Sequence, residues 1–306
     1  MSTPTEQSVT VNGVDLAYDV RGPAEAPAVL LIAGLGAQLI NWRDGFVDVL
    51  IERGFRVIRF DNRDIGKSTY FDDAPVPDIG AARGGDTSKA SYTMSDMAAD
   101  AAGLLGALGI DKAHVVGSSM GGMIAQRVAI DHPDKVLSLT SIMSTTGDRS
   151  VGEATPEATA ALMTPVPLDR EQALDKLTAD SRIIGSPGFP FDEAATRARH
   201  AQAVDRALNP AGTARQFAAI IASPDRTDEL RKLDVPTLVV HGSADPLVGV
   251  SGGKATAAAI PGARLLVIEG MGHDLPEGTW AEIADAIADL AKVDGVRRGL
   301  DAVGSN

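Results

Sequence analysis

The chain has 306 residues, enough to bury a large core, and its formal net charge is −13 at pH 7. This negative balance argues against a nucleic-acid partner, because phosphate backbones are recognised by surfaces of the opposite sign. The chain contains no cysteine. Disulfides, thiolate metal sites and a cysteine nucleophile are therefore excluded, and cysteine usage does not indicate a redox compartment.

The polar N-terminus and the length of the apolar runs bear on location. Residues 1–10 contain no basic-then-apolar signal segment. The longest mostly apolar stretch, residues 28–40, contains two glycines and is too short to span a bilayer. We therefore expect a cytoplasmic protein without an integral membrane segment, with export by an unusual route as the alternative.

The predicted elements begin with a hairpin and continue as strands that alternate with helices. Two alternating stretches flank Asn12-Gly13, a dipeptide that is typical of tight hairpin turns. The next stretch, residues 28–33, is continuously apolar, as expected for a strand that is buried on both faces. In chain order, the predicted strands are residues 8–11, 14–20, 28–33, 55–60, 113–116, 136–143, 236–241 and 264–268.

Helical periodicity appears between these strands. Apolar residues recur at helical spacing from Met97 to Leu108, and Ser95 and Asp96 are placed to start this helix. Further helices are predicted over residues 120–130 and 277–293. Strands that alternate with helices imply a mostly parallel sheet that is covered by helices on both faces.

Residues 145–234 break this alternation. They contain no convincing strand, and prolines separate their predicted helices at 171–179, 192–206 and 213–221. We interpret this segment as a helical cap inserted over the carboxyl edge of the sheet. The expected organisation is a first part of the core at residues 1–144, the cap at 145–234 and a second part of the core at 235–306.

The most informative motif joins the strand at 113–116 to the following helix. It reads Gly-x-Ser-x-Gly, with Ser119 in the middle and Gly117 and Gly121 on either side. So tight a turn requires a sterically poor backbone conformation, which is tolerable when close neighbours lack side chains. Such strain is worth keeping where a serine oxygen must meet a substrate.

A serine nucleophile needs a base to take its proton, and the base needs an orienting group. Asp245 follows one predicted strand, and His273 lies in the Gly-rich loop after the last one. Asp274 is a rival orienting group, but adjacent side chains in a loop usually diverge. His241 is expected to be a buried histidine that binds the backbone. The order Ser, Asp, His is the order of the α/β-hydrolase fold.

Nearly the whole chain resembles the α/β-hydrolase family, because four motifs occur in that family's order. These motifs are Gly34-Leu35-Gly36 after an early strand, the turn around Ser119, Asp245-Pro246 after a strand, and Gly272-His273 after the last strand. The resemblance implies an α/β fold with an eight-stranded, mostly parallel sheet, helices on both faces and a helical cap insertion.

The resemblance also implies a role for each site residue. Ser119 attacks a carbonyl carbon, His273 moves the proton, and Asp245 orients and stabilises the imidazole. The backbone N–H of Met120 and an N–H of the early loop form the oxyanion hole. No cofactor is expected, and no cluster of His, Asp or Glu has metal-ligand spacing.

The early loop departs from the common family pattern. Many members carry His-Gly there, whereas this chain has Ala33-Gly34. The change removes a side chain that often braces the loop but leaves the generic backbone N–H groups in place. Leu35 is the expected second oxyanion donor, with Gly34 and Gly36 as alternatives.

Residues 60–69 and 270–276 are similar to segments of bacterial esterases related to aclacinomycin methylesterase. This similarity implies hydrolysis of a carboxylic ester. It does not transfer the polyketide substrate, because the pocket lies mainly in the insertion. Since the insertion is rich in apolar residues, we expect a small-molecule ester with an apolar part. The oligomeric state is left open.

Other functions on the same scaffold were weighed. Ser119 argues against dehalogenases and epoxide hydrolases, which place an aspartate at this turn. Carbon–carbon hydrolases and cofactor-free haloperoxidase-type enzymes commonly have an aromatic residue after Gly-His, where residues 274–276 read Asp-Leu-Pro. A non-catalytic ligand receptor is a further alternative. Asp61, Arg63 and Asp64 resemble catalytic residues at first sight, but we interpret them as a structural salt-bridged turn.

Overall fold

The structure is a computed structural model that describes residues 6–303, with side chains to residue 292. An eight-stranded sheet in the order β1-β2-β4-β3-β5-β6-β7-β8 forms the centre of this described part. β2 is antiparallel to β1 and to β4, and the later pairings are parallel. The strands are β1 (Gln7–Val11), β2 (Val14–Arg21), β3 (Ala28–Ile32), β4 (Arg56–Phe60), β5 (Ala113–Ser118), β6 (Val136–Ile142), β7 (Thr237–Gly242) and β8 (Arg264–Ile268).

The first strands form where local signals are strongest. Asn12 and Gly13 both have positive φ values, 50° and 78°, as the tight turn between β1 and β2 requires. All five residues of β3 are buried, as the continuous apolar run predicts. β3 lies between β4 and β5, and its side chains join hydrophobic clusters on both faces of the sheet. The predicted α/β-hydrolase architecture is confirmed.

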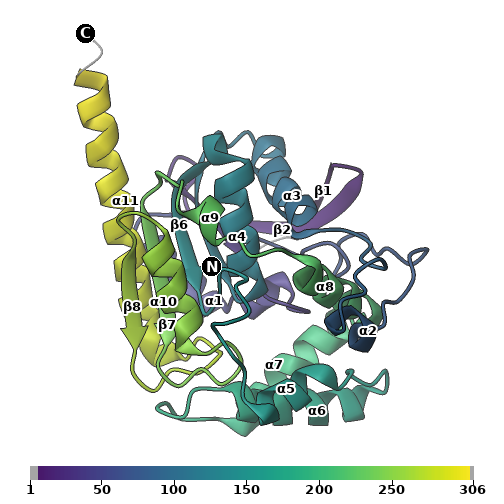
Figure 1. Cartoon of the computed structure of the whole chain (residues 1–306). Helices are drawn as coiled ribbons and strands as arrows, with labels where there is room; N and C mark the ends of the chain where they lie inside the picture. Colours follow the sequence, from purple (N-terminus) through teal and green to yellow (C-terminus); the bar gives the residue numbers. More distant parts are fainter. Residues whose placement is uncertain (1–5, 304–306) are drawn as a thin grey trace.

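Two hydrophobic clusters lie on opposite faces of the sheet. Side chains alternate along β3, so that Leu30 and Ile32 join one cluster while Val29 and Leu31 join the other. The first cluster packs under α3 (Met94–Ala107), α4 (Met120–Asp131) and α10 (Val250–Ala259), and the second under α1 (Asp44–Glu52) and α11 (Trp280–Val303). The parallel strands have their carboxyl ends at one edge of the sheet, and a layer of helices lies on each side of it (Figure 1).

Between β6 and β7 the chain forms helices and no strand, among the described residues. α6 packs against both α5 and α7, and these three helices lie together in one layer apart from the sheet (Figure 1). α8 packs against α2 (Ile79–Arg83), and α9 packs against α4 and α10. The helices of this segment are α5 (Pro156–Met163), α6 (Arg170–Ile184), α7 (Glu193–Arg206), α8 (Pro210–Ala222) and α9 (Thr227–Leu230). Residues 145–234, which contain these helices, are called the cap.

Helix ends differ in part from the predictions. α3 begins at Met94. The Thr93 side chain accepts from the Asp96 amide, and the Asp96 side chain accepts from the Thr93 amide, so the two residues form a capping box. α11 begins at Trp280 after a 3₁₀ turn and continues to Val303, beyond the predicted end at residue 293. Among the described residues, no helix combines the length and the apolarity needed to cross a membrane.

Candidate active site

Ser119 lies between the end of β5 and the start of α4. Its φ is 57° and its ψ is −121°, a strained conformation for a residue with a side chain. A Cβ at Gly117 would lie 1.9 Å from the Gly121 carbonyl oxygen, and one at Gly121 would lie 2.1 Å from that of Ile32. Both glycines are therefore required by close backbone approach, as the motif predicts.

The structure brings Ser119, His273 and Asp245 into one hydrogen-bonded chain. His273 Nε2 lies 2.9 Å from Ser119 Oγ, and His273 Nδ1 lies 2.7 Å from Asp245 Oδ2. The other carboxylate oxygen of Asp245 accepts from the backbone N–H groups of Leu247 and Val248, both at 2.9 Å. These bonds hold the carboxylate so that it faces the imidazole.

The charge on Asp245 is stabilised by its neighbours. Burial on its own raises the pKa of this carboxyl group, but the imidazole of His273 and hydrogen bonds from His241, His273 and the Val248 amide outweigh burial. The pKa of Asp245 therefore lies well below its usual range. The group remains a carboxylate wherever the protein is folded near neutral pH.

His241 and Asp274 take the positions that the sequence predicts for them. His241 Nε2 lies 2.7 Å from the Val248 carbonyl oxygen and 3.5 Å from Asp245, so it braces the loop that carries the carboxylate. Asp274 instead accepts a hydrogen bond from the Ser186 hydroxyl, which lies in the cap. The carboxylate that is bonded to the His273 imidazole is therefore that of Asp245 and not that of its sequence neighbour.

The cap also holds the loop of His273, a connection that the sequence analysis did not find. The His273 amide donates to the Ile184 carbonyl at 2.7 Å, and the Gly272 amide donates to the Ser186 hydroxyl at 2.8 Å. A Cβ at Gly272 would lie 2.1 Å from the carbonyl oxygen of Gly185. The end of α6 and the following turn thus lie directly on the loop.

The loop after β3 borders the serine. A Cβ built on Gly34 would lie 3.3 Å from Ser119 Cβ. The amide of Gly36 already donates to Gln216 Oε1 at 3.0 Å, which argues against it as an oxyanion donor. Met120 is the first residue of α4, so its N–H has no acceptor within that helix. Leu35 and Met120 therefore stay the predicted donors.

The charged side chains in the turn after β4 form salt bridges, as the sequence predicts. Each charged side chain of the turn has an ion-pair partner in another element: Asp61 with Arg206, Arg63 with Asp100, and Asp64 with Arg215. Arg206 belongs to α7 and Arg215 to α8. Two of the three pairs therefore connect the core to the cap.

A cavity of about 280 Å³ lies between the loop after β3 and helices α5 to α8. Its wall is mostly apolar and includes Leu35 from the core, with Leu177, Val204 and Phe217 from the cap. Ser119 is not part of this wall, but the loop after β3 lines the cavity at Leu35 and borders the serine at Gly34. No group of His, Asp or Glu among the described residues could hold a metal ion.

Comparisons with known proteins find curated relatives that align over most of this chain. Rhodomycin D methylesterase DauP from Streptomyces sp. (strain C5) is 32% identical over 291 residues, which cover 87% of this chain and 90% of the relative. Rhodomycin D methylesterase DnrP from Streptomyces peucetius is 31% identical over 284 residues, with the same coverage of each chain. The expected similarity to bacterial methylesterases is thus confirmed.

A solved structure and a family model identify the fold and its family. The enol-lactonase from Burkholderia xenovorans LB400 superposes with a TM-score of 0.69 at 25% identity, covering 95% of this chain and 100% of its own. The model described as "alpha/beta hydrolase fold" matches residues 27–277. The chain belongs to the alpha/beta hydrolase fold family.

Proposed function

We propose that the protein hydrolyses carboxylic esters through an acyl-enzyme, with Ser119 as nucleophile, His273 as base and Asp245 as orienting group. One observation carries the proposal: the hydrogen-bonded chain from the serine hydroxyl through the imidazole to a buried carboxylate, with contacts of 2.9 Å and 2.7 Å. The methylesterase relatives, which align over most of this chain, support an ester as substrate.

Each step assigns a proton to a stated atom. As Ser119 Oγ attacks the ester carbonyl carbon, its proton passes to His273 Nε2. The tetrahedral intermediate expels the alcohol, which takes that proton and leaves the acyl group on Ser119. A water molecule then attacks the acyl-enzyme and gives a proton to His273 Nε2. As the second tetrahedral intermediate collapses, that proton passes to Ser119 Oγ, the bond from Oγ to the acyl carbon breaks, and the acid is released. Asp245 stays ionised and stabilises the imidazolium in both halves.

The proposed oxyanion hole consists of the backbone N–H groups of Leu35 and Met120. The position of Gly34 beside Ser119 supports this, because it brings the backbone that leads to Leu35 next to the serine. Donors of this kind are held in place before charge develops, and the loss of one typically costs about 3 kcal/mol of barrier.

The cavity supports a small-molecule ester with an apolar part. Leu35 forms part of its wall, so an acyl or alcohol group in the cavity would be connected to a carbonyl beside the oxyanion loop. Helices α5 to α8 supply most of the remaining wall. The length of this apolar group is therefore set by the cap.

The experiment combines an active-site label with a substrate panel. A fluorophosphonate should modify Ser119, and p-nitrophenyl esters should give a burst of nitrophenol that equals the enzyme concentration. Ser119→Ala should lower kcat by about four to six orders of magnitude with the fold retained. The adjacent Ser118→Ala variant is the matched control and should remain active.

Two results would contradict the proposal. Failure of the wild type to form an adduct, under conditions that label ordinary esterases, would favour a ligand receptor. Faster turnover of a vinylogous diketone than of any ester, including a methyl ester, would favour a carbon–carbon hydrolase.

A further inference from the structure

The loop that contains Leu35 is tied to the cap through Gln38. The side-chain amide of Gln38 donates to the carbonyl oxygens of Ala203 and Ala207, both at 2.7 Å, and its oxygen accepts from Arg206 Nη1 at 2.6 Å. Ala203 and Arg206 belong to the last turn of α7, and Ala207 directly follows that helix. Gln38 is buried, so these are bonds that water cannot replace without opening the contact.

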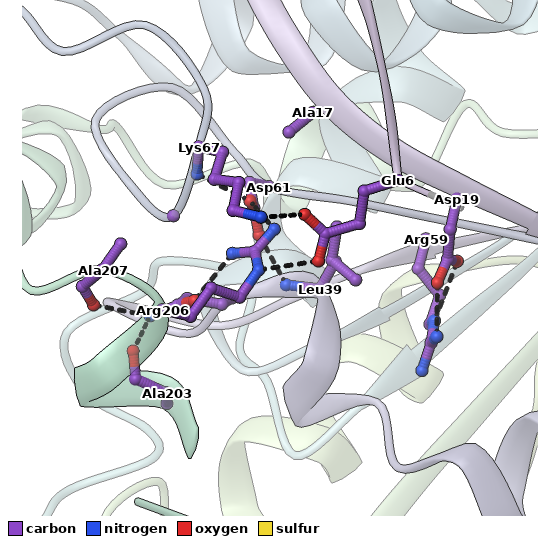
Figure 2. Close-up of polar contacts among 12 residues, drawn as sticks. Glu6, Ala17, Asp19, Leu39, Arg59, Asp61, Lys67, Ala203, Arg206 and Ala207 are labelled. Atoms are coloured by element: carbon purple, nitrogen blue, oxygen red, sulfur yellow. Dashed lines mark hydrogen bonds and ion pairs between the residues drawn. The ribbon is translucent and has the colours of Figure 1, made fainter. Parts of the chain in front are cut away.

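Arg206 provides a second connection from α7 to the same loop. Its guanidinium pairs with Asp61 at 2.7 Å, and the other Asp61 oxygen accepts from the Leu39 amide at 2.7 Å. Figure 2 shows the Arg206 guanidinium and the Lys67 ammonium side by side, each facing one oxygen of the Glu6 carboxylate. Of the two carboxylates that pair with Arg206, Asp61 is the one that accepts from the Leu39 amide.

α8 provides a third connection. Gln216 is fully buried, accepts from the Gly36 amide at 3.0 Å and donates to the Arg63 carbonyl oxygen at 2.9 Å. Gly36 and Gln38 lie one and three residues after Leu35. The described bonds that reach the loop from α7 and α8 thus fix the backbone on the C-terminal side of the proposed donor.

We propose that Gln38, with Gln216 and Arg206, braces the loop after β3 from the cap and positions the Leu35 N–H. Gln38 is then a positioning residue, and the oxyanion hole is complete only when α7 and α8 are docked. This inference rests on the proposed function of Ser119 and Leu35.

The test variant is Gln38→Met, which keeps the length of the side chain and removes its hydrogen bonds. We expect kcat to fall about 10- to 100-fold, somewhat less than the loss of a whole donor, with KM for a short ester nearly unchanged. Glu6→Gln is the control, because Glu6 pairs with Arg206 but has no described bond to the loop after β3. It should keep kcat within about threefold.

A second measurement separates positioning from a general loss of structure. A trifluoromethyl ketone forms a tetrahedral adduct with a serine, whereas the matching methyl ketone binds mainly as a ground-state ligand. Gln38→Met should lower the affinity for the trifluoromethyl ketone by about the same factor as kcat. Its affinity for the methyl ketone should stay within about threefold of that of the wild type. If this variant does not fold, Gln216→Met, which frees the Gly36 amide, is measured in the same way.

The outcomes distinguish this inference from the function on which it rests. A wild type that neither hydrolyses esters nor binds the trifluoromethyl ketone at Ser119 would refute the proposed function itself. An active wild type, with a folded Gln38→Met variant that keeps kcat and the ratio of the two ketone affinities, would overturn the positioning role alone.

Discussion

Gly34 lies directly against Ser119: a Cβ at position 34 would be 3.3 Å from the Ser119 Cβ and 3.8 Å from its hydroxyl oxygen. Gly34→Ala should therefore crowd the side from which a carbonyl approaches the serine. We expect kcat/KM to fall about 10- to 100-fold, with about 1–2 kcal/mol lost in the free energy of unfolding. Steady-state kinetics and urea unfolding measure the two effects.

Gly106→Ala is the matched control for that substitution. Gly106 lies in α3, and an added Cβ there would meet nothing within 4 Å. The Gly106→Ala variant should gain up to about 1 kcal/mol in the free energy of unfolding, because alanine has a higher helix propensity than glycine, and its kcat/KM should be unchanged. If Gly34→Ala and Gly106→Ala had the same kinetics, the loop after β3 would not border the reacting carbonyl.

Asp245→Asn should remove the charge that orients and stabilises the His273 imidazole. An amide can donate to Nδ1 and so favour the wrong tautomer, and we expect kcat to fall about 10⁴-fold with the fold retained. Asp274→Asn is the comparison, because Asp274 is bonded to Ser186 and not to the imidazole. Equal losses in both variants, measured with the same ester, would contradict the assignment of Asp245.

Signals that reside in a short stretch of chain were sufficient to predict much of the fold. The conformation of the turn at Asn12-Gly13 and that of the buried strand β3 can each be predicted from the residues of that segment alone. α10 was missed, because its Gly-Gly pair and small residues weaken any helical pattern. The reason for those residues is tertiary: a Cβ at Gly253 would lie 2.3 Å from the Nδ1 atom of His241.

The same distinction applies to the site. Ser119, Asp245 and His273 could be predicted because each follows a strand, and parallel strands end at one edge of the sheet. The contacts of the cap with the catalytic loops could not be predicted. Gln38 and Ala203 are separated by 165 residues in the chain. The sequence around either residue gives no sign that the Gln38 side-chain amide binds the carbonyl oxygens at the end of α7.

Ser186→Ala tests the second place where the cap holds the site. Its hydroxyl accepts from the Gly272 amide at 2.8 Å, so the variant leaves a buried donor without that partner. We expect the free energy of unfolding to fall by about 1–3 kcal/mol and kcat to fall several-fold as the His273 loop loosens. Ser150→Ala, in an exposed turn of the cap, should change neither quantity. A Ser186→Ala enzyme with unchanged kcat would show that the loop keeps its position without the cap hydroxyl.

His200 should make the stability of the cap depend on pH. It lies on α7 and contacts the Ser181 hydroxyl of α6 at 2.8 Å. Burial is the largest cause of its lowered pKa, and Arg199 also lowers it, while Asp180 acts in the opposite direction. A histidine in the unfolded chain titrates near pH ~6.5, so the unfolded chain binds more protons in this range. The free energy of unfolding therefore rises with pH through that value and declines below it.

The measurement compares urea unfolding of the wild type and His200→Gln at about pH 7.5 and about pH 5.5, on either side of the histidine titration. Glutamine can still bond to Ser181 but does not titrate, so the variant should lose less stability than the wild type as the pH falls. His132→Gln, at the end of α4 and outside the cap, should retain the wild-type difference. If His200→Gln and the wild type lost equal free energy between the two conditions, protonation of His200 would not be coupled to folding of the cap.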